Sequence, residues 1–512
     1  MIHRIIEFSA KNKFIVFLFV ASACVGGWWS LKNVPLDAIP DLSDTQVIIY
    51  SRWDRSPDII EDQVTYPIIT AMLGTPRVKD IRGFSDFGYS YVYVIFDEGT
   101  DIYWARSRAL EYLSKITPRL PQGVQTELGP DATSIGWVFQ YALVDTSGRQ
   151  SLEAMRSYQD WYLRYYVQSV PGVAEVAPIG GFVRQYQVNV DPNLLASYRI
   201  PLDMVVEAVR RSNNDVGGRL VEFSGREFMV RGRGYAQSLR DIEEIVIGPS
   251  AMNSASEEGS VEARHASGTM TVRGLARGTP VRVRDVARVE LGPDIRRGVA
   301  DLDGQGDVVG GVVIMRSNEN ALKVIDRVKA KFDEIRPSLP PGVKIVTTYD
   351  RSELILRSIE TLKHTLTEEI LIVSGVILIF LWHIPSALIP ILTIPITVLI
   401  SFIPMKAVGV TSNIMSLGGI AIAIGAMVDA AIVVVEQTHK KLEQWEAEGR
   451  KRDYHAVVVE AVQEVGPASF FSLLVIAVSF MPIFALEAQE GRLFKPLAFT
   501  KNFSMAIAAL LA

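Results

Sequence analysis

The stretch from Val408 to Val435 constrains this chain most, because it is almost wholly apolar and carries one ionisable side chain, Asp429. A membrane-spanning helix needs roughly 20 apolar residues, so this stretch is long enough to cross a bilayer. An aspartate deep in such a helix costs about 2.5–3.5 kcal/mol on insertion scales, and residues of this kind usually serve a function. We therefore predict a membrane helix with a working carboxylate.

Small residues and methionines surround Asp429 in the sequence. The small residues should let neighbouring helices approach closely and enclose the carboxylate in protein. They are Gly418, Gly419, Ala421, Ala423, Gly425, Ala426, Ala430 and Ala431. The same predicted helix carries Met415 and Met427, whose thioethers are soft ligands. An intramembrane acid beside soft ligands indicates proton-coupled transport of a soft metal ion.

Composition narrows the class of protein. The chain has 512 residues, 48% of them hydrophobic and 21% charged, which fits apolar spans joined to a soluble part. A net charge of −5 gives no reason to expect nucleic acid. The single cysteine, Cys24, excludes intrachain disulfides and CxxC metal sites. The six histidines show no HxxxH or HExxH spacing, and no nucleophile–base pair or phosphate loop appears, so an enzyme is disfavoured.

The N-terminus predicts a first membrane helix over residues 14–31, after a basic cytoplasmic segment, residues 1–13. A signal peptide is the alternative. However, the apolar run is longer than a typical signal-peptide core of about 7–15 residues, and no small-residue cleavage site follows cleanly. Trp28 and Trp29 are typical of the membrane interface. We interpret the segment as a retained helix.

Residues 32–369 contain no span of membrane length and read as a soluble α/β block. Strand patterns alternate with amphipathic helical patterns. Strands are expected over 46–50, 89–96, 185–190 and 308–315, and helices over 59–73, 102–116, 152–167 and 321–335.

The block contains an internal repeat. Residues 76–81 resemble 171–176, and 120–124 resemble 339–343, each pair in the same place relative to helices and strands. This predicts two ferredoxin-like units, the second interrupted by residues 191–289. Within that insertion, residues 250–268 are polar and small, with Met252, His265 and Met270 in or beside them. The segment is interpreted as a solvated surface loop, with metal capture as the alternative.

Further spans are expected over 362–382, 385–405, 411–436 and 466–486, with the start of a sixth over 497–512. A cytoplasmic loop over 438–465 holds five Lys and Arg, which agrees with the positive-inside rule and places residues 32–369 outside. The uncharged run 502–512 is too short to cross a bilayer, so the chain is expected to be a fragment.

Several motifs resemble one transporter family. They are Pro35–Asp44, Gly83–Gly88, Leu128–Thr133, Gly298–Gly311 and Glu490–Phe494. With the order of helices and external units, they resemble the heavy-metal efflux branch of the resistance-nodulation-division (RND) family. Ala423–Glu436 resembles the copper and silver pumps, whereas pumps for zinc, cobalt and nickel usually show Asp-Phe-Gly and Asp-Gly-Ala in this motif. Gln437 stands where asparagine is usual.

The resemblance implies an α+β polytopic membrane protein that is half of an RND pump. Residues 32–135 would form the first periplasmic porter subdomain, and residues 136–190 with 290–350 the second. Residues 191–289 would belong to the docking subdomain. The pump would be a homotrimer in the inner membrane of a Gram-negative bacterium. Driven by the proton gradient, and joined to a periplasmic adaptor and an outer-membrane channel, it would expel Cu(I) or Ag(I) without a resident cofactor.

Asp429 is the expected proton-relay carboxylate, since burial raises the pKa of a carboxyl and a nearby cation lowers it. A carboxylate permanently paired with a buried lysine is the alternative. Glu436 is either a second relay group or a simple interfacial charge.

Met415, Met427 and Met505 fall where the resemblance places methionines in the membrane, so they are the expected metal ligands; packing methionines are the alternative. Met415 and Met427 would lie about 18 Å apart along one helix and cannot share a site. Met505 could complete a pair with Met427. Met405 and Met481 are interpreted as packing residues, and Ile295 stands where copper pumps can carry a further methionine.

Two other functions remain open from the sequence. The nearer one is a divalent zinc, cobalt or nickel pump of the same branch. The more distant one is a non-transporting membrane sensor or translocation auxiliary with a similar external domain.

Overall fold

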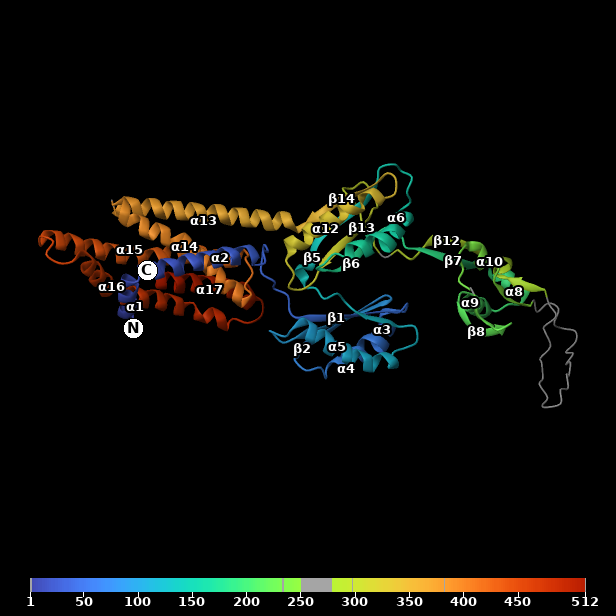
Figure 1. Ribbon diagram of the computed structural model, residues 1–512. Coiled ribbons are helices and arrows are strands. Elements are labelled where there is room, and N and C mark those ends of the chain that lie inside the picture. Colours follow the sequence, from blue (N-terminus) through green and yellow to red (C-terminus); the bar gives the residue numbers. More distant parts are fainter. Residues whose placement is uncertain (1, 233, 250–278, 297, 382, 512) are drawn as a thin grey trace. The chain divides into compact units, whose positions relative to one another are not determined.

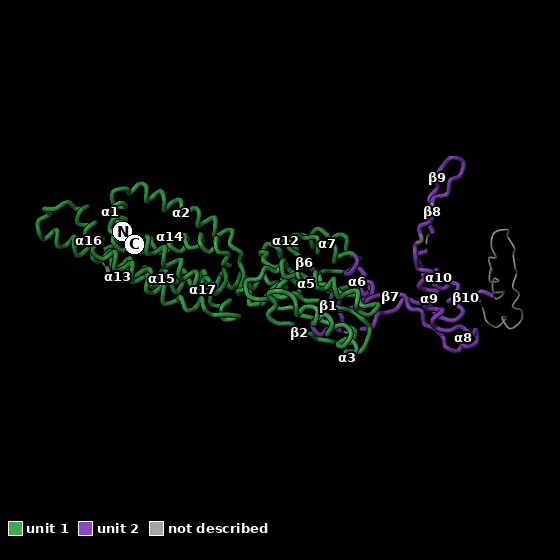
Figure 2. The backbone as a smooth tube through the Cα atoms, turned by 90° about the horizontal axis from the view of Figure 1, so that it is seen from below, with its two compact units in different colours: residues 1–146, 162–178, 310–512 green, residues 147–161, 179–309 purple. Residues whose placement is uncertain are grey.

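The computed structural model describes residues 2–232, 234–249, 279–296, 298–381 and 383–511. It divides into two compact units (Figure 2). The first comprises residues 1–146, 162–178 and 310–512, and the second comprises residues 147–161 and 179–309. The predicted insertion, residues 191–289, lies inside the second unit, which also takes in residues on both sides of it.

A four-stranded sheet in the first unit has the strand order β2-β3-β1-β4. Its elements are β1 (Gln46–Arg52), α3 (Pro57–Ile60), η1 (Glu61–Thr65), α4 (Tyr66–Met72), β2 (Val78–Asp86), β3 (Tyr89–Phe96), α5 (Ile102–Ile116), η2 (Thr117–Arg119) and β4 (Gln125–Leu128). Strand β1 pairs with both β3 and β4, and β2 with β3, all antiparallel. This βαββαβ order is ferredoxin-like.

Local sequence explains these elements. Side chains along β3 alternate between buried and half-buried positions over most of its length, because successive strand residues point to opposite faces of a sheet. Asp101 caps α5, accepting a hydrogen bond from the backbone N–H of Trp104 at 2.8 Å. The buried faces of α4 and α5 pack with the strands into one apolar core, which includes Ile68, Val92 and Ala109.

A second four-stranded sheet repeats the arrangement in the order β14-β5-β13-β6. Its region contains η3 (Ser134–Gly136), β5 (Trp137–Asp145), α6 (Leu152–Tyr158), η4 (Gln159–Leu163), α7 (Arg164–Gln168), β6 (Val173–Gly180), β13 (Val309–Met315), α12 (Ala321–Ile335), η6 (Arg336–Ser338) and β14 (Val343–Asp350). Phe332 of α12 packs on the sheet, with its ring centroid 4.7 Å from that of Tyr141. When the strands of each sheet are numbered by their order along the chain, the first sheet reads 2-3-1-4 and the second reads 4-1-3-2, which is the same order from the opposite edge. This agreement confirms the predicted repeat.

The second unit contains the interruption between β6 and β13. Its remaining elements are β7 (Arg184–Val190), α8 (Pro192–Tyr198), α9 (Leu202–Ser212), β8 (Val216–Phe223), β9 (Arg226–Gly232), α10 (Leu239–Glu243), β10 (Val246–Pro249), β11 (Pro280–Arg282), α11 (Val283–Val286) and β12 (Ala287–Pro293). Strands β7 and β12 form an antiparallel two-stranded ribbon. The strand predicted over 185–190 therefore belongs to this ribbon and not to the second four-stranded sheet, so the predicted grouping of residues 136–190 with 290–350 does not hold at this strand. The predicted loop 250–268 and Met270 lie outside the described residues.

The long apolar helices and the short helices next to them, most of them labelled in Figure 1, belong to the first unit (Figure 2). They are α1 (Ile2–Lys11), α2 (Lys13–Asn33), α13 (Arg351–Leu381), α14 (Ile384–Val408), α15 (Ile414–Ala447), α16 (Tyr454–Ser479), η7 (Met481–Ala485) and α17 (Ala488–Leu511). Among the described residues, four are long and apolar enough to cross a membrane: α2, α14, α15 and the stretch Tyr454–Ala485.

Helices α13 and α17 lie where the second and sixth spans were predicted. Neither is among the four helices that are apolar enough to cross a membrane. In α13 the uncharged part begins only after Glu369, and α17 carries Arg492, Lys495 and Lys501. The predicted loop 438–465 is largely helical, because α15 continues to Ala447 and α16 begins at Tyr454. The connection that was expected to be a cytoplasmic loop is thus a helical hairpin.

Gly27 sits where α2 meets α14, and a Cβ built on it would lie 2.3 Å from the backbone oxygen of Leu399. We expect Gly27→Ala to push the two helices apart and to lower the free energy of unfolding by about 1–3 kcal/mol. Gly26 is the matched control, since its Cβ would lie 3.4 Å from the flexible end of Ile403. Thermal unfolding in detergent measures both variants, and equal melting temperatures would contradict this close contact.

Candidate functional site

Helix α15 positions the predicted site residues, and its start is fixed by a capping box. The Asn413 side chain accepts a hydrogen bond from the Ser416 N–H at 3.0 Å, while the Asn413 N–H donates to Ser416 Oγ at 2.8 Å. Both residues are buried. Gly419 then brings α15 against α17, since a Cβ there would lie 2.4 Å from the backbone oxygen of Leu497. This confirms that a small residue on α15 allows close helix approach.

Met427 of α15 and Met505 of α17 are buried in the same apolar cluster. Each is 1% exposed, and both belong to one apolar cluster that also contains residues of α13, α14 and α16. The remaining buried members of this cluster are Ile377, Ala387, Ile394, Ala423, Ile424, Val428, Ala430, Leu473 and Ala508. Two thioethers from different helices therefore share a dry environment. Met415 is half-buried and lies outside this cluster.

Asp429 follows Met427 by two residues and is exposed in this chain. It makes no hydrogen bond or ion pair with any described residue. A Cβ built on Gly425, one turn earlier, would meet nothing within 4 Å. The small residues of α15 therefore face two ways: Gly419, Ala423 and Ala430 are buried, whereas Gly425 lies on the open face with Asp429. The chain by itself does not enclose the carboxylate.

Glu436, the weaker candidate relay residue, has a partner one turn along α15. Its Oε1 lies 2.7 Å from Lys440 Nζ, and both side chains are more than half exposed. Exposed pairs at this spacing contribute about 0.3–0.5 kcal/mol. This geometry suits an interfacial charge better than a relay group.

Lys501 on α17 is a buried cation that the sequence reasoning overlooked. It is 2% exposed, and its Nζ lies 2.8 Å from the ring centroid of Phe480. It precedes Met505 by one helical turn. A lysine inside the predicted sixth span was the signal that could have identified it.

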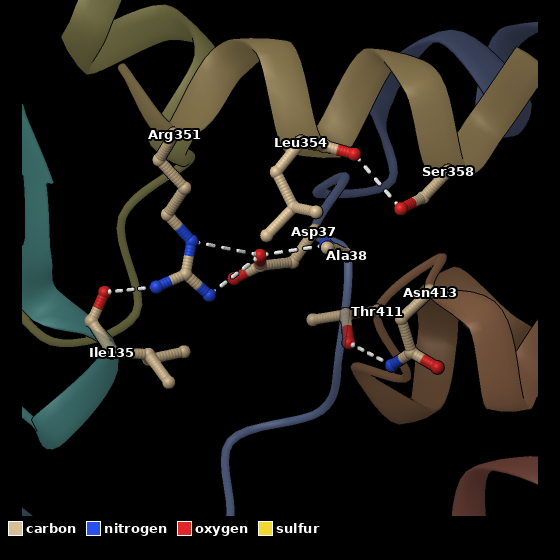
Figure 3. Close-up of polar contacts among 8 residues, drawn as sticks. All are labelled: Asp37, Ala38, Ile135, Arg351, Leu354, Ser358, Thr411 and Asn413. Carbon is tan, nitrogen blue, oxygen red and sulfur yellow. Dashed lines mark hydrogen bonds and ion pairs between the residues drawn. The ribbon is translucent and has the colours of Figure 1, made fainter. Parts of the chain in front are cut away.

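A second polar site lies where the helices meet the strand-rich part of the first unit (Figure 3). Arg351, the first residue of α13, donates from Nε and Nη2 to Asp37 Oδ1 at 3.2 and 2.9 Å. Its Nη1 donates to the backbone oxygen of Ile135 at 2.8 Å. The two charged side chains are only 8% and 12% exposed. One guanidinium therefore joins α13, the segment before β5 and the segment that follows α2.

The segment Val34–Asp44, which we call the connecting segment, continues these contacts. Backbone hydrogen bonds join Asp37 N to Ser412 O at 3.1 Å and Ile414 N to Ala38 O at 3.2 Å, so the segment touches the start of α15. Arg492 of α17 donates to Asp44 Oδ1 at 2.7 Å and to Leu42 O at 2.8 Å. The connecting segment is thus tied to α13, to the start of α15 and to α17.

The Asp350 carboxyl, next to Arg351, is held in its ionised form near neutral pH. Burial raises the pKa of the Asp350 carboxyl, but hydrogen bonds from Lys329 and Ser352 outweigh it, so the pKa lies below its usual value. Because the folded-state pKa is depressed, the stabilisation is present near neutral pH and is lost as the pH falls through the folded-state pKa.

Ile295, in the position where copper pumps can carry a methionine, is 78% exposed. Among the described residues, no group of three or more His, Cys, Asp or Glu side chains is arranged to hold a metal ion. Met427 and Met505, which share one buried apolar cluster, therefore remain the candidate metal ligands among the membrane helices.

Comparison with known proteins finds relatives that match the whole length of this chain. The chain is 51% identical to the cation efflux system protein CusA of Escherichia coli (strain K12) and to the putative cation efflux system protein SilA of Salmonella typhimurium. Both matches cover 100% of this chain and 47% of the relative. Identity to the cobalt-zinc-cadmium resistance protein CzcA of Cupriavidus metallidurans is 34%, at the same coverage. The chain thus spans about half the length of the curated relatives it matches.

A solved structure shares the fold. It is the X-ray crystal structure of a heavy metal efflux pump in crystal form II, with a TM-score of 0.82 and 30% identity, covering 99% of this chain and 47% of that chain. This confirms the predicted α+β architecture of membrane helices and ferredoxin-like units. The strand-rich part is periplasmic, and the helices cross the inner membrane.

A family model described as the AcrB/AcrD/AcrF family matches residues 5–512. This is a family of efflux transporters and not of enzymes. The chain therefore belongs to the AcrB/AcrD/AcrF family, the RND transporters, and corresponds to the N-terminal half of its CusA-type members.

Proposed function

We propose that this chain works in the pump subunit of a proton-driven system that exports Cu(I) or Ag(I) across the inner membrane. The observation that carries the proposal is that Met427 and Met505 are each 1% exposed and lie in one buried cluster, with Met427 two residues before Asp429. Thioethers match soft monovalent ions and stay uncharged at any pH. A metal path and a proton-exchanging carboxylate would then share helix α15.

The divalent pump is the nearest competing function. Zinc and cobalt prefer imidazole, thiolate and carboxylate ligands, whereas the buried pair offers two thioethers. The higher identity to CusA, 51% against 34% for the cobalt-zinc-cadmium protein, also favours the monovalent cargo. The Ala423–Glu436 motif, which resembles copper and silver pumps, points the same way.

The proposed assembly is a homotrimer joined to a periplasmic adaptor and an outer-membrane channel. The second unit, which includes residues 191–289, would supply part of the surface that faces the channel. Asp429 would exchange the proton, with partners outside this chain, because no described residue pairs with it here.

A metal-resistance assay in cells that lack their own pumps tests the cargo. Expression of the pump is expected to protect against silver and copper more than against zinc or cobalt. Protection against zinc alone would make the divalent function the correct one. Protection against neither, with the protein correctly inserted, would favour a sensor or auxiliary.

Met427→Leu and Met505→Leu test the metal path directly. Leucine keeps the volume and apolar character, so each change should cost under about 1.5 kcal/mol of stability while removing the sulfur ligand. We expect silver resistance to fall sharply in both variants, and no further in the double variant. Met405→Leu is the matched control, because Met405 is fully buried and lies in a different apolar cluster. Unchanged resistance in all three variants would assign the pair to packing.

A further inference from the structure

Two histidines that are far apart in the sequence meet at one end of the helices. His383 lies in the turn between α13 and α14, and His439 lies on α15 after the predicted membrane span. Their ring centroids are 5.7 Å apart, with an angle of 36° between the ring planes. By the predicted topology, both residues are on the cytoplasmic side, next to the basic helical hairpin.

Each ring has one nitrogen engaged by an oxygen. His383 Nδ1 lies 2.8 Å from Ser386 Oγ, and His439 Nε2 lies 3.4 Å from Glu443 Oε1. In the part of the chain that the structure describes, His383 Nε2 and His439 Nδ1 have no such partner. Histidines that bind metals usually engage the second ring nitrogen with an oxygen acceptor, which fixes the ring orientation and the tautomer. Each ring therefore keeps one nitrogen available for a metal ion.

We propose that His383 and His439 form a two-nitrogen site for a monovalent d10 metal ion, Cu(I) or Ag(I), on the cytoplasmic side of the pump. Such ions accept two donors in a near-linear arrangement, whereas Zn(II) sites in proteins are almost always four-coordinate. Imidazole suits copper, and the Glu443 carboxylate beside His439 offsets the charge of the cation. The proposal rests on the proposed function, since it names where that cargo is first bound.

The site is reachable and is placed to hand an ion on. His383 is exposed, and the His439 side chain is 43% exposed, so an ion can arrive from solvent. Along α15, His439 follows Met427 by about 18 Å, the same spacing that separates Met427 from Met415. The three residues mark successive levels of α15, from the cytoplasmic end toward the connecting segment.

Silver binding to the full chain in detergent or nanodiscs tests the site, with Ag(I) titrated calorimetrically and no pH gradient present. His383→Gln and His439→Gln are each expected to remove about one bound Ag(I) per chain, and the double variant should remove the same one. Ser386→Ala should weaken that binding step by roughly 10-fold, as loss of an outer-sphere partner does.

His364→Gln is the matched control. His364 has a carboxylate at the same helical spacing, 3.5 Å away on Glu368, but no second histidine is paired with its ring among the described residues. Its variant should bind Ag(I) as the parent does. Identical titrations for the parent, His383→Gln and His439→Gln would overturn the proposal, and so would Zn(II) binding through the pair that matches or exceeds Ag(I) binding. This experiment measures binding and not transport. Loss of the histidine site would therefore leave the proposed export function standing, and loss of the export function would leave silver binding at the site standing.

Discussion

If the pump exports silver and copper as proposed, replacing Asp429 with asparagine is expected to abolish the resistance to these metals. Asparagine has nearly the same shape but cannot exchange a proton at neutral pH. The side chain is exposed in this chain and has no described partner, so the change removes no packing that the chain provides. Growth on graded silver concentrations, with the protein quantified in membranes, gives the measurement.

Glu436→Gln is the control for this change. Glu436 lies seven residues further along the same helix, but its exposed carboxylate is already paired with Lys440 at 2.7 Å. Losing such a pair costs at most about 0.5 kcal/mol, so resistance should remain near that of the parent. Export at the full rate by Asp429→Asn would contradict the relay role of Asp429. Another group would then have to couple export to the proton gradient.

Arg351→Met is expected to produce the largest loss of stability. The change leaves the Asp37 carboxylate, 12% exposed, without its cation, and frees the backbone oxygen of Ile135. Removing one partner of a buried pair typically costs about 3–5 kcal/mol. The melting temperature of the purified protein should fall accordingly, and less protein should accumulate in membranes.

Two comparisons isolate the buried pair. Arg357, six residues along α13, pairs with Glu353 at 3.5 Å with both side chains more than two-thirds exposed, so Arg357→Met should have little effect. Changing Asp37→Leu together with Arg351→Met removes both charges and should recover part of the loss. If Arg351→Met and Arg357→Met melt at the same temperature, the junction contact does not stabilise the fold.

The hydrophobic periodicity of the sequence predicted several helices and strands of the soluble part with nearly correct bounds. The helix expected over 102–116 is α5, and the strand expected over 89–96 is β3, because both patterns reflect burial on one face. The internal repeat predicted two ferredoxin-like units, and the two sheets share one strand order. The end of α15 was not predicted by periodicity, because the residues beyond 436 are largely charged or polar and show no apolar pattern. The helix continues there through pairs such as Glu436–Lys440 and through packing against α16.

The contacts that could not be predicted from the sequence join residues that are far apart along the chain. Asp37 and Arg351 are separated by 314 positions, and nothing in the local pattern of either residue indicates the other. His383 and His439 are likewise brought together only by the packing of α14 and α15. Met427 and Met505 were paired by resemblance, and the helices place them in one cluster. Asp429 is exposed and pairs with none of the described residues, so its partners cannot be read from this sequence.

The central claim is that protonation of Asp429 is coupled to movement of a soft monovalent ion, and proton-coupled Ag(I) flux tests it most directly. The complete pump would be reconstituted in liposomes with an imposed pH gradient, and silver and proton fluxes would be followed together. We expect silver transport that stops when a protonophore collapses the gradient, and that is absent in Asp429→Asn while Ag(I) still binds. Silver transport by Asp429→Asn that still follows the pH gradient would contradict the account.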